Sequence, residues 1–310
     1  LGFAIEPVTW NALKKQIRHV NDERNGERVV PYEIIAKELL KSFLAQPVQA
    51  FDIWSESGAI KMLLPELLAM QGCPQPKQYH REGDVWTHTR LALAVLKRPV
   101  FKKIHGAPNA ETVLAVLFHD IAKPKTITRP KKPGERIRFD GHDAVGADMT
   151  RRIAERLRLS SYKEKLIDVD AERLGNLVRY HLLPMSGDPR TMRATTIERH
   201  YLRDELFGRE LLALHYADGS AAINANGRPG LSGYRAMKKR ITALLGKKKT
   251  ALPPPLLDGH EIMKALNMKP GPKVGALMEQ LREAQLQGKI KTKNEAKIYL
   301  KKTAPSEHKK

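Results

Sequence analysis

Apolar residues recur along most of the chain at the three- and four-residue spacing of an α-helix. Within residues 32–40, Tyr32, Ile35, Ala36 and Leu39 follow this spacing and would line one helix face. Residues 113–118 are apolar on every side, which is typical of a buried central helix. Residues 137–139 favour a short strand, whereas the other periodic segments favour helices. The pattern therefore predicts an all-α fold.

Breaks in this helical pattern divide the chain into three regions. Residues 72–76 contain two prolines and favour a linker, and residues 253–255 are three consecutive prolines that form a stiff spacer. A third region begins near Gly227. We predict an N-terminal helical region at 1–75, a histidine-rich domain at 76–226 and a basic helical region at 227–310.

The charge balance indicates a polyanionic partner. The chain has 55 Lys and Arg residues against 34 Asp and Glu, a net charge of +21 and a pI near 10.0. Each phosphate that a basic side chain neutralises releases a condensed counterion, so nucleic acid is the first candidate. An anionic membrane surface is the second, without a lipidation motif to support it. The alternative is a basic surface that only keeps the protein soluble. The candidate RNA-contacting residues are Lys247, Lys248, Lys249, Lys269, Lys273, Lys289 and Lys291.

Cysteine usage and hydropathy bear on the compartment. Cys73 is the single cysteine, so an internal disulfide is impossible, which fits a reducing cytoplasm. No apolar run approaches the roughly 20 residues that span a bilayer. The chain begins at Leu1 without an initiator methionine or a charged signal-peptide region. We therefore expect a cytoplasmic protein without a membrane partner, and a chain that is a fragment.

Histidines and carboxylates in the central region predict a metal centre. His119 and Asp120 follow the apolar segment 113–118, in a helix that Lys123 and Pro124 are expected to end. Burying both side chains there is costly unless a partner compensates. A divalent cation is such a partner, because imidazole and carboxylate suit Zn, Mn, Fe and Mg-type ions. His88 begins an amphipathic helix. Asp218 is expected to end an apolar helix, where the helix dipole disfavours a carboxylate unless a cation is bound.

Two further histidines are candidates for a second ion. His142 directly follows Gly141, and His181 ends the helical pattern of residues 177–181. Two ions about 4 Å apart would clamp a phosphate and activate a bridging water. For these two histidines the alternative of an ordinary core position stays open. The same core or surface interpretation is our expectation for His19, His80, His105, His200, His215, His260 and His308.

The order His88, His119-Asp120, Asp218 resembles the H…HD…D signature of the HD superfamily of metal-dependent phosphohydrolases. Residues 119–124 resemble that superfamily's HDIGKP motif, with Ala122 where the family commonly has glycine. The resemblance implies that Asp120 and Lys123 serve catalysis, Lys123 by approaching a substrate phosphate.

The flanking segments resemble a narrower family, the bacterial tRNA nucleotidyltransferases and poly(A) polymerases. Segments 82–89 and 139–146 resemble the HD region of that family; segments 1–5 and 42–66 resemble its neck; 269–275 with 285–291 resemble its C-terminal RNA-binding part. The family's catalytic head carries a Gly-Ser motif followed by paired aspartates, which this sequence lacks. Asp168 and Asp170 have the D-x-D spacing without a preceding Gly-Ser, and we interpret them as a solvated loop. We therefore expect that this chain alone does not add nucleotides to RNA.

The resemblance implies a helical neck, an HD helical core and a small helical C-terminal unit. It implies one or two divalent ions (Mn, Ni, Co, Zn, Fe or Mg), a phosphoester substrate, a water nucleophile whose pKa the ion lowers, and RNA, tRNA in particular, as partner. Two rivals stay open. One is a non-catalytic RNA-binding body with a structural metal site, and the other is an HD enzyme that hydrolyses nucleotides without binding RNA.

Overall fold

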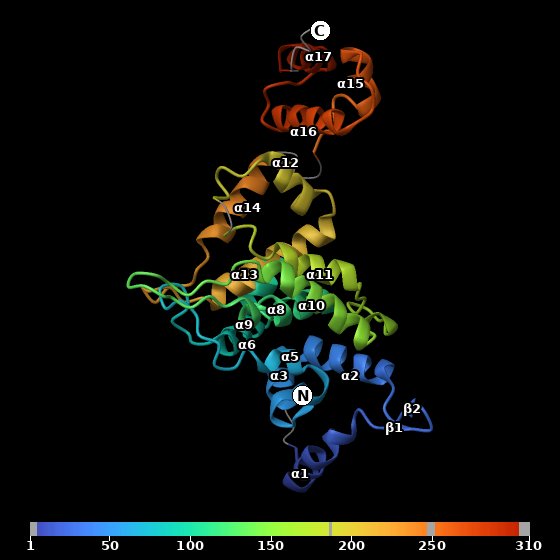
Figure 1. Cartoon of the computed structure of the whole chain (residues 1–310), viewed down its shortest axis with the longest axis vertical. Helices are drawn as coiled ribbons and strands as arrows, with labels where there is room; N and C mark the ends of the chain where they lie inside the picture. The colour runs from blue at the N-terminus through green and yellow to red at the C-terminus, as the bar shows by residue number, and fades with distance from the viewer. Residues whose placement is uncertain (1–4, 186–187, 247–251, 304–310) are drawn as a thin grey trace. The chain divides into compact units, whose positions relative to one another are not determined.

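The computed structural model describes residues 5–185, 188–246 and 252–303. The fold is almost entirely helical, which confirms the all-α prediction (Figure 1). Within the described residues, β1 (Glu23–Arg24) and β2 (Glu27–Arg28) form a two-stranded antiparallel sheet. The strand expected at 137–139 is reduced to a single antiparallel bridge between Thr128 and Arg138.

The described chain folds into two compact units. The first contains the described residues up to 185 together with 209–235, and the second contains residues 188–208 and 236–303. The N-terminal region and the histidine-bearing region therefore share one unit. The domain boundaries inferred from the sequence stay a prediction.

The N-terminal part of the first unit is a series of short helices. These are α1 (Pro7–Gln16), a 3-10 turn at Ile17–His19, α2 (Tyr32–Ala45), α3 (Pro47–Glu56), α4 (Ala59–Leu63) and α5 (Pro65–Leu68). Proline begins α1, α3 and α5, where its fixed φ suits the first helical position and its missing N–H costs nothing.

The remaining helices of the first unit surround α8. They are α6 (Val85–Val95), α7 (Pro99–His105), α8 (Ala110–Phe118), α9 (Lys123–Thr126), α10 (His142–Arg156), a 3-10 turn at Leu159–Ser161, α11 (Ala171–Tyr180) and α13 (Glu205–Ala221). Every residue of α8 is buried, and α2, α6 and α11 pack against it. The fully apolar segment 113–118 thus forms the centre of the unit, as its sequence predicts.

Two predicted helix ends were wrong. Residues 123 and 124 do not close the apolar helix: α8 ends at Phe118, and Lys123 begins the separate short helix α9. Asp218 does not end its helix either, because α13 continues through Gly219 to Ala221. A Cβ on Gly219 would lie 3.0 Å from the carbonyl oxygen of Gly230, so glycine is the residue that suits this close approach within the helix. Asp218 still lies in the last turn of α13.

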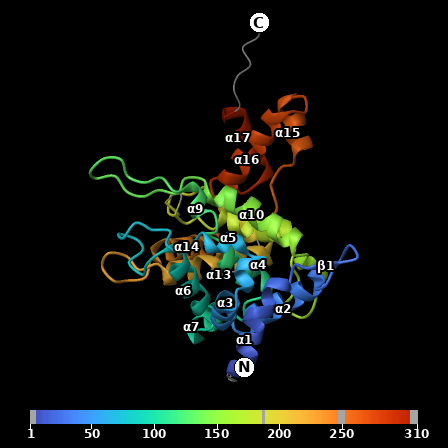
Figure 2. The ribbon, with the colours of Figure 1, turned by 60° about the horizontal axis from the view of Figure 1, so that its bottom comes forward.

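The second unit contains α12 (Ala194–Ile197), a π-helical turn at Glu198–Leu202, the later part of α14 (Ser232–Leu245), α15 (Gly259–Leu266), α16 (Pro272–Leu286) and α17 (Lys293–Thr303). The last three helices pack around one apolar cluster that includes Ile262, Leu281 and Leu300, and they lie together in Figures 1 and 2. Asp258 and Glu261 form a capping box at the start of α15. Among the helices that the structure describes, none has the length and hydropathy that crossing a bilayer requires.

Candidate metal centre

Five helices of the first unit bring their ends to one buried place. His88 lies in the first turn of α6, His119 caps the C-terminal end of α8, and His142 is the first residue of α10. His181 follows the last residue of α11, and Asp218 lies in the last turn of α13. All five side chains are buried, although they are far apart in the sequence.

The first group of ligand atoms gathers between α6, α8 and α13. His88 Nε2 lies 3.0 Å from Asp218 Oδ1 and 3.3 Å from His119 Nε2. His119 Nε2 lies 3.3 Å from Asp120 Oδ2. The structure thus places the four residues of the H…HD…D pattern in mutual contact.

The second group gathers at the other oxygen of Asp120. His142 Nε2 and His181 Nε2 lie 3.2 Å apart, and their distances from Asp120 Oδ1 are 3.4 and 3.7 Å. Asp120 Oδ2 faces the first group and Oδ1 faces the second, so Asp120 belongs to both. His88, His119 and Asp120 of the first group could hold one metal ion, and Asp120, His142 and His181 could hold another.

Backbone carbonyls fix the orientation of three of the four rings. His119 Nδ1 donates to Val116 O at 2.8 Å, and His181 Nδ1 donates to Val178 O at 2.6 Å. His142 Nδ1 donates to Phe139 O at 2.7 Å. A carbonyl oxygen can only accept, so each Nδ1 carries a hydrogen and each ring turns its Nε2 inward.

The facing lone pairs fit a divalent ion. His142 and His181 present two Nε2 lone pairs to each other at 3.2 Å, an arrangement that repels unless a cation or a proton lies between them. Burial, together with the neighbouring His142, lowers the pKa of His181 to about 3, so His181 is a neutral ring that can ligate an ion. Neutral imidazole nitrogens beside a buried carboxylate are the donor set that divalent transition ions prefer.

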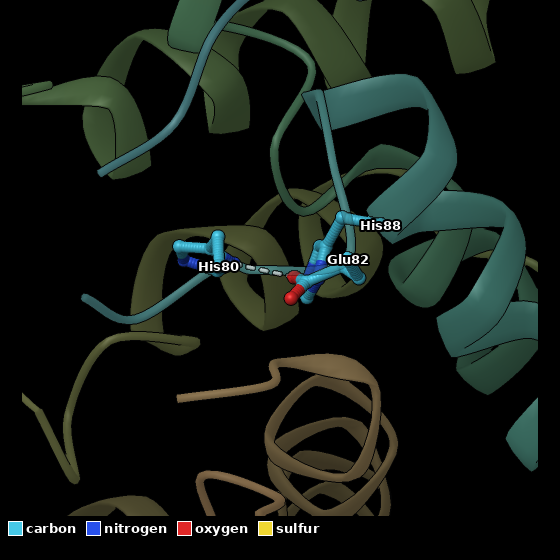
Figure 3. Close-up of side chains that lie close together, drawn as sticks. All are labelled: His80, Glu82 and His88. Atoms are coloured by element: carbon cyan, nitrogen blue, oxygen red, sulfur yellow. Dashed lines mark hydrogen bonds and ion pairs between the residues drawn. The ribbon is translucent and has the colours of Figure 1, made fainter. Parts of the chain in front are cut away.

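Glu82 holds the outer nitrogen of His88 (Figure 3). Its Oε1 accepts from His88 Nδ1 at 2.8 Å and from His80 Nδ1 at 2.7 Å, and its Oε2 accepts from Ile223 N at 2.8 Å. Burial would raise the pKa of Glu82, but these hydrogen bonds outweigh it and lower the pKa to about 2. Glu82 therefore stays ionised and directs His88 Nε2 toward Asp218.

The charge around His88 also matches a cation. Burial disfavours its imidazolium, but hydrogen bonds to Asp218 and Glu82 raise the pKa of His88 to about 9. Two carboxylates thus attract positive charge to this ring from both sides. A metal ion in place of the Nε2 proton would satisfy the same attraction.

Lys123 lies beside the shared carboxylate. Its Nζ is 2.6 Å from Asp120 Oδ2 and donates to Gln75 Oε1 at 2.7 Å, with both partners buried. Burial alone would raise the pKa of Asp120, but His119 and Lys123 hold it well below its usual range. Asp120 is therefore ionised, as a metal ligand must be.

Most of the other histidines have ordinary environments. His215 is buried near Tyr180 O, at 3.3 Å, and burial lowers its pKa to about 4. His105 packs among aromatic rings, and His19 pairs with Asp22 on the surface. His308 lies outside the described residues. His80 differs from the expectation, because with Glu82 and His88 it forms a third group of potential ligands.

The candidate RNA-contacting lysines of the described second unit are exposed. Lys269 precedes α16 and Lys273 lies in its first turn, while Lys289 and Lys291 follow its C-terminal end. Lys247, Lys248 and Lys249 lie outside the described residues.

The sequence interpretation missed two supporting residues. Glu82 lies in segment 82–89 and Gln75 in the linker 72–76, and the sequence pattern indicates no role for either at the metal centre. A carboxylate six residues before a candidate ligand is a usable signal, because ligating histidines commonly donate their second N–H to a carboxylate. Gln75 offered no comparable signal, since its contact with Lys123 depends on how the linker folds back.

Comparison with known proteins agrees with this geometry. The HD domain family model matches residues 87–223. The chain is 32% identical over 309 residues to an A-adding tRNA nucleotidyltransferase of Deinococcus radiodurans, a match that covers 98% of this chain and 65% of the relative. It is 30% identical over 309 residues to a CC-adding tRNA nucleotidyltransferase of Thermus thermophilus, covering 97% of this chain and 63% of that relative.

A more distant relative extends the same likeness. The chain is 28% identical over 295 residues to a multifunctional CCA protein of Alkalilimnicola ehrlichii, a match that covers 94% of this chain and 61% of that protein. The chain thus spans less than two thirds of the length of each of these three relatives. Residues 87–223 are thus similar to the HD domain family, and nearly the whole chain is similar to part of these tRNA nucleotidyltransferases.

Proposed function

We propose that the first unit is a metal-dependent phosphohydrolase acting on a phosphodiester or phosphomonoester. One observation carries the proposal: two pairs of inward-facing imidazole nitrogens lie on either side of the buried, ionised Asp120. A structural site closes its coordination with protein ligands, whereas a hydrolytic site keeps a position open for water or substrate. Lys123 places a cation beside the shared carboxylate, where it can meet a phosphate.

The proposed roles divide the six residues between two ions. His88, His119, Asp120 and Asp218 would hold the first, and Asp120, His142 and His181 the second. A divalent ion bound there supplies the Lewis acidity that lowers the pKa of a water and turns it into the nucleophile. Asp120 joins the two groups through its two oxygens, and Glu82 keeps the lone pair of His88 directed inward.

Lys123 is proposed to receive the substrate phosphate. Its ammonium has three N–H donors, two of which face Asp120 and Gln75. The third can meet a phosphate oxygen without breaking either contact. Lys123 would thereby neutralise charge that develops on the phosphoryl oxygens during hydrolysis.

RNA is the proposed partner of the whole chain, and tRNA the proposed kind. The net charge of +21 supports a polyanion, and the similar proteins are named for tRNA. Exposed Lys269, Lys273, Lys289 and Lys291, with Lys247–Lys249, are the proposed phosphate contacts. Binding of RNA that survives moderate salt would exclude the rival in which this HD enzyme acts on nucleotides alone.

The decisive test combines metal analysis with hydrolysis. We expect the purified protein to retain Mn, Ni, Co, Zn, Fe or Mg and to hydrolyse p-nitrophenyl phosphate or bis-p-nitrophenyl phosphate. Asp120→Ala should lower the rate at least about a hundredfold, since it removes a ligand common to both groups. Asp168→Ala, which alters an exposed carboxylate away from the centre, is the matched control.

The outcomes separate the proposal from its main rival. A structural site would be established if the unaltered protein binds metal without hydrolysing either ester, and if Asp120→Ala loses both the metal and stability. Absence of metal, with unchanged stability and no hydrolysis in any protein, would show that the hydrolase proposal is wrong.

A further inference from the structure

The segment that joins α9 to α10 carries an unusual density of positive charge. We call residues 125–138 the basic arm. It contains six basic side chains and one acidic side chain, Glu135. All six basic side chains are exposed: Lys125, Arg129, Lys131, Lys132, Arg136 and Arg138.

Both ends of the basic arm are attached to the metal centre. Lys123, which contacts Asp120, lies just before it, and His142, which contacts His181, lies just after it. Two backbone hydrogen bonds between Thr128 and Arg138, of 2.8 and 3.1 Å, hold the two limbs together as a hairpin. In Figures 1 and 2 this green hairpin projects away from the helices.

A cavity adjoins the basic arm. Arg136 donates to Tyr79 OH at 2.9 Å and lies 5.5 Å from the centre of that half-exposed ring. The residues on either side of Tyr79 line an open cavity of about 810 Å³, whose lining includes Gln75, Lys77, Gln78, His80, Arg81 and Asp84. Gln75 and His80 connect this cavity to the centre, through Lys123 and through Glu82 respectively.

We propose that the basic arm and this cavity bind a single-stranded RNA whose terminal phosphoester enters the metal centre. The inference rests on the proposed hydrolase function and names its substrate class: oligonucleotides in preference to mononucleotides. The terminal nucleotide occupies the cavity, and the phosphates that follow lie along the arm.

The size of the arm decides between these two classes of substrate. From Thr128 to its tip the limb is about five residues, up to about 16 Å when extended. Six cations spread over that length cannot all meet one phosphate, whereas successive phosphates of a strand can engage several of them. Tyr79 adds an exposed aromatic ring, and such rings bind bases of single strands by stacking.

The reaction conserves atoms without another reactant. Water attacks the terminal phosphorus of an RNA 3′-phosphate, a new P–O bond forms and the bond from phosphorus to the ribose 3′ oxygen breaks. The leaving oxygen takes up a proton, which gives an RNA 3′-hydroxyl and inorganic phosphate. With an RNA 3′-phosphodiester, water attacks the same phosphorus and the bond to the oxygen of the second ester group breaks. That group leaves as its alcohol after taking up a proton, and an RNA 3′-phosphate remains.

The test compares one nucleotide with a short strand. Uridine 3′-phosphate and pentauridylate 3′-phosphate are the probes for a monoesterase, and their 3′-p-nitrophenyl diesters are the probes for a diesterase. We expect the pentanucleotide to have a kcat/KM at least about tenfold higher at low salt. Each phosphate contact on a single strand contributes about 0.7 to the slope of log affinity against log salt.

Lys131→Gln/Lys132→Gln alters two exposed side chains of the arm without touching a ligand. It should reduce the pentanucleotide's advantage at least about threefold and lower the salt slope by about 1.4. It should leave hydrolysis of p-nitrophenyl phosphate and bis-p-nitrophenyl phosphate unchanged. Lys102→Gln/Lys103→Gln is the matched control. These exposed lysines lie on α7, which follows the C-terminal end of α6, whereas His88 lies in the first turn of α6.

Each outcome bears on the inference. A selective loss with pentanucleotide in the arm variant, and none in the control, supports it. Equal rates for nucleotide and pentanucleotide, or equal losses in both variants, would overturn the inference while the hydrolase function stands. If no ester is hydrolysed by the unaltered protein, the proposed function and the inference fail together.

Discussion

Asp120 divides its two carboxylate oxygens between two histidine pairs, so the pairs can be tested separately. His142→Gln or His181→Gln removes a nitrogen from the second group and leaves the first intact. We expect metal content to fall from two ions per chain to one, and hydrolysis to fall at least about tenfold. Elemental analysis and steady-state rates measure both effects.

Exposed His260→Gln is the control for losing one imidazole. One ion per chain in the unaltered protein, with mild effects of both variants, would contradict the two-metal arrangement. The second pair would then be an ordinary buried contact.

Glu82 gives a second prediction at this scale, because it orients a ligand without being one in the proposed assignment. Glu82→Gln keeps the size of the side chain but can no longer accept two imidazole N–H bonds as an anion. Metal affinity should weaken about 10- to 100-fold while the number of bound ions at saturation is unchanged. Isothermal titration with Mn²⁺ or Zn²⁺ measures the affinity.

The comparison variant for Glu82 is His80→Gln, which leaves the contact between Glu82 and His88 in place. A loss of affinity equal to that of Glu82→Gln would assign His80 to the metal itself. It would contradict a purely orienting role for Glu82.

Among the elements, the close packing of α10 against α11 depends on Gly146. A Cβ on Gly146 would lie 3.2 Å from Val178 Cγ1, which is a tight contact, and 3.6 Å from the methyl group of Ala122, which is an ordinary one. The close approach that needs glycine is therefore the approach to α11.

Gly146→Leu should consequently destabilise the protein by about 1 to 3 kcal/mol through overpacking. Because α10 carries His142, the variant should also weaken binding of the second ion. Urea denaturation and metal titration measure the two effects. Ala122→Gly is the counterpart, and it should leave metal content unchanged, losing only about 1 kcal/mol or less through backbone flexibility. A Gly146→Leu variant as stable as the parent would show that the helices have room to separate.

The helices α8, α11 and α13 share one buried ion network with a defined pH dependence. Arg173 contacts Glu111 at 2.7 Å and Glu210 at 2.6 Å, so one guanidinium serves two carboxylates. Burial, with Glu210 nearby, raises the pKa of Glu111 from its ordinary value to about 7. Glu111 therefore binds a proton more tightly in the folded than in the unfolded state.

Its stabilising contribution is complete below about pH 4.5 and is lost as the pH rises through about 7. Glu111→Gln should remove this part of the pH dependence. The free energy of unfolding of the unaltered protein should decline between pH 5 and pH 8 by on the order of 2 kcal/mol more than that of the variant. Exposed Glu172→Gln should retain the full decline, and equal declines in all three proteins would refute the assignment.

Elements with a strong local signal were predicted from the sequence. The apolar run that forms α8 is the clearest case. The β1–β2 hairpin was not predicted, since its two-residue strands are too short to show alternation. The extension of α13 through Gly219 was not predicted, because glycine after a helical pattern usually marks a helix end. The close approach of Gly219 to Gly230 is a tertiary contact that the pattern does not reveal.

The candidate site likewise contains residues that the sequence predicted and contacts that depend on tertiary structure. Residue types and spacing identified His88, His119, Asp120 and Asp218 as a set, and the structure brings them into contact; their metal ligation stays a prediction. The sharing of Asp120 between two groups could not be predicted from the sequence, because no local pattern relates His142 to His181 and their contact depends on the tertiary fold. The role of Glu82 was equally hidden, since its acceptance from Ile223 N depends on a residue 141 positions away.

At the scale of the whole molecule, the excess of positive charge predicts salt-sensitive RNA binding. Lys269 and Lys273 are separated from Lys289 and Lys291 by α16, about 22 Å of helix. The two pairs therefore meet different phosphates. Replacing all four by glutamine should weaken tRNA binding at low salt and reduce the salt slope by about 3 to 4.

Fluorescence anisotropy across a salt series measures this slope. If the four-lysine variant binds tRNA more weakly but still hydrolyses p-nitrophenyl phosphate at the normal rate, the second unit binds RNA independently of the metal centre. An unchanged slope would mean that these lysines only solubilise the surface.

An ion bound where the five helix ends meet at Asp120 would also stabilise the first unit as a cross-link. An ion ligated by both His88 and Asp218 ties together positions 130 residues apart, and so cross-links α6 to α13. Because the unfolded chain cannot offer this set of donors, ligation energy becomes folding energy. At an ion concentration one hundred times the Kd, the gain is about 2.7 kcal/mol. EDTA should then act on this protein as a mild denaturant, lowering its melting temperature and making the helices that carry the ligands the first to open to proteases.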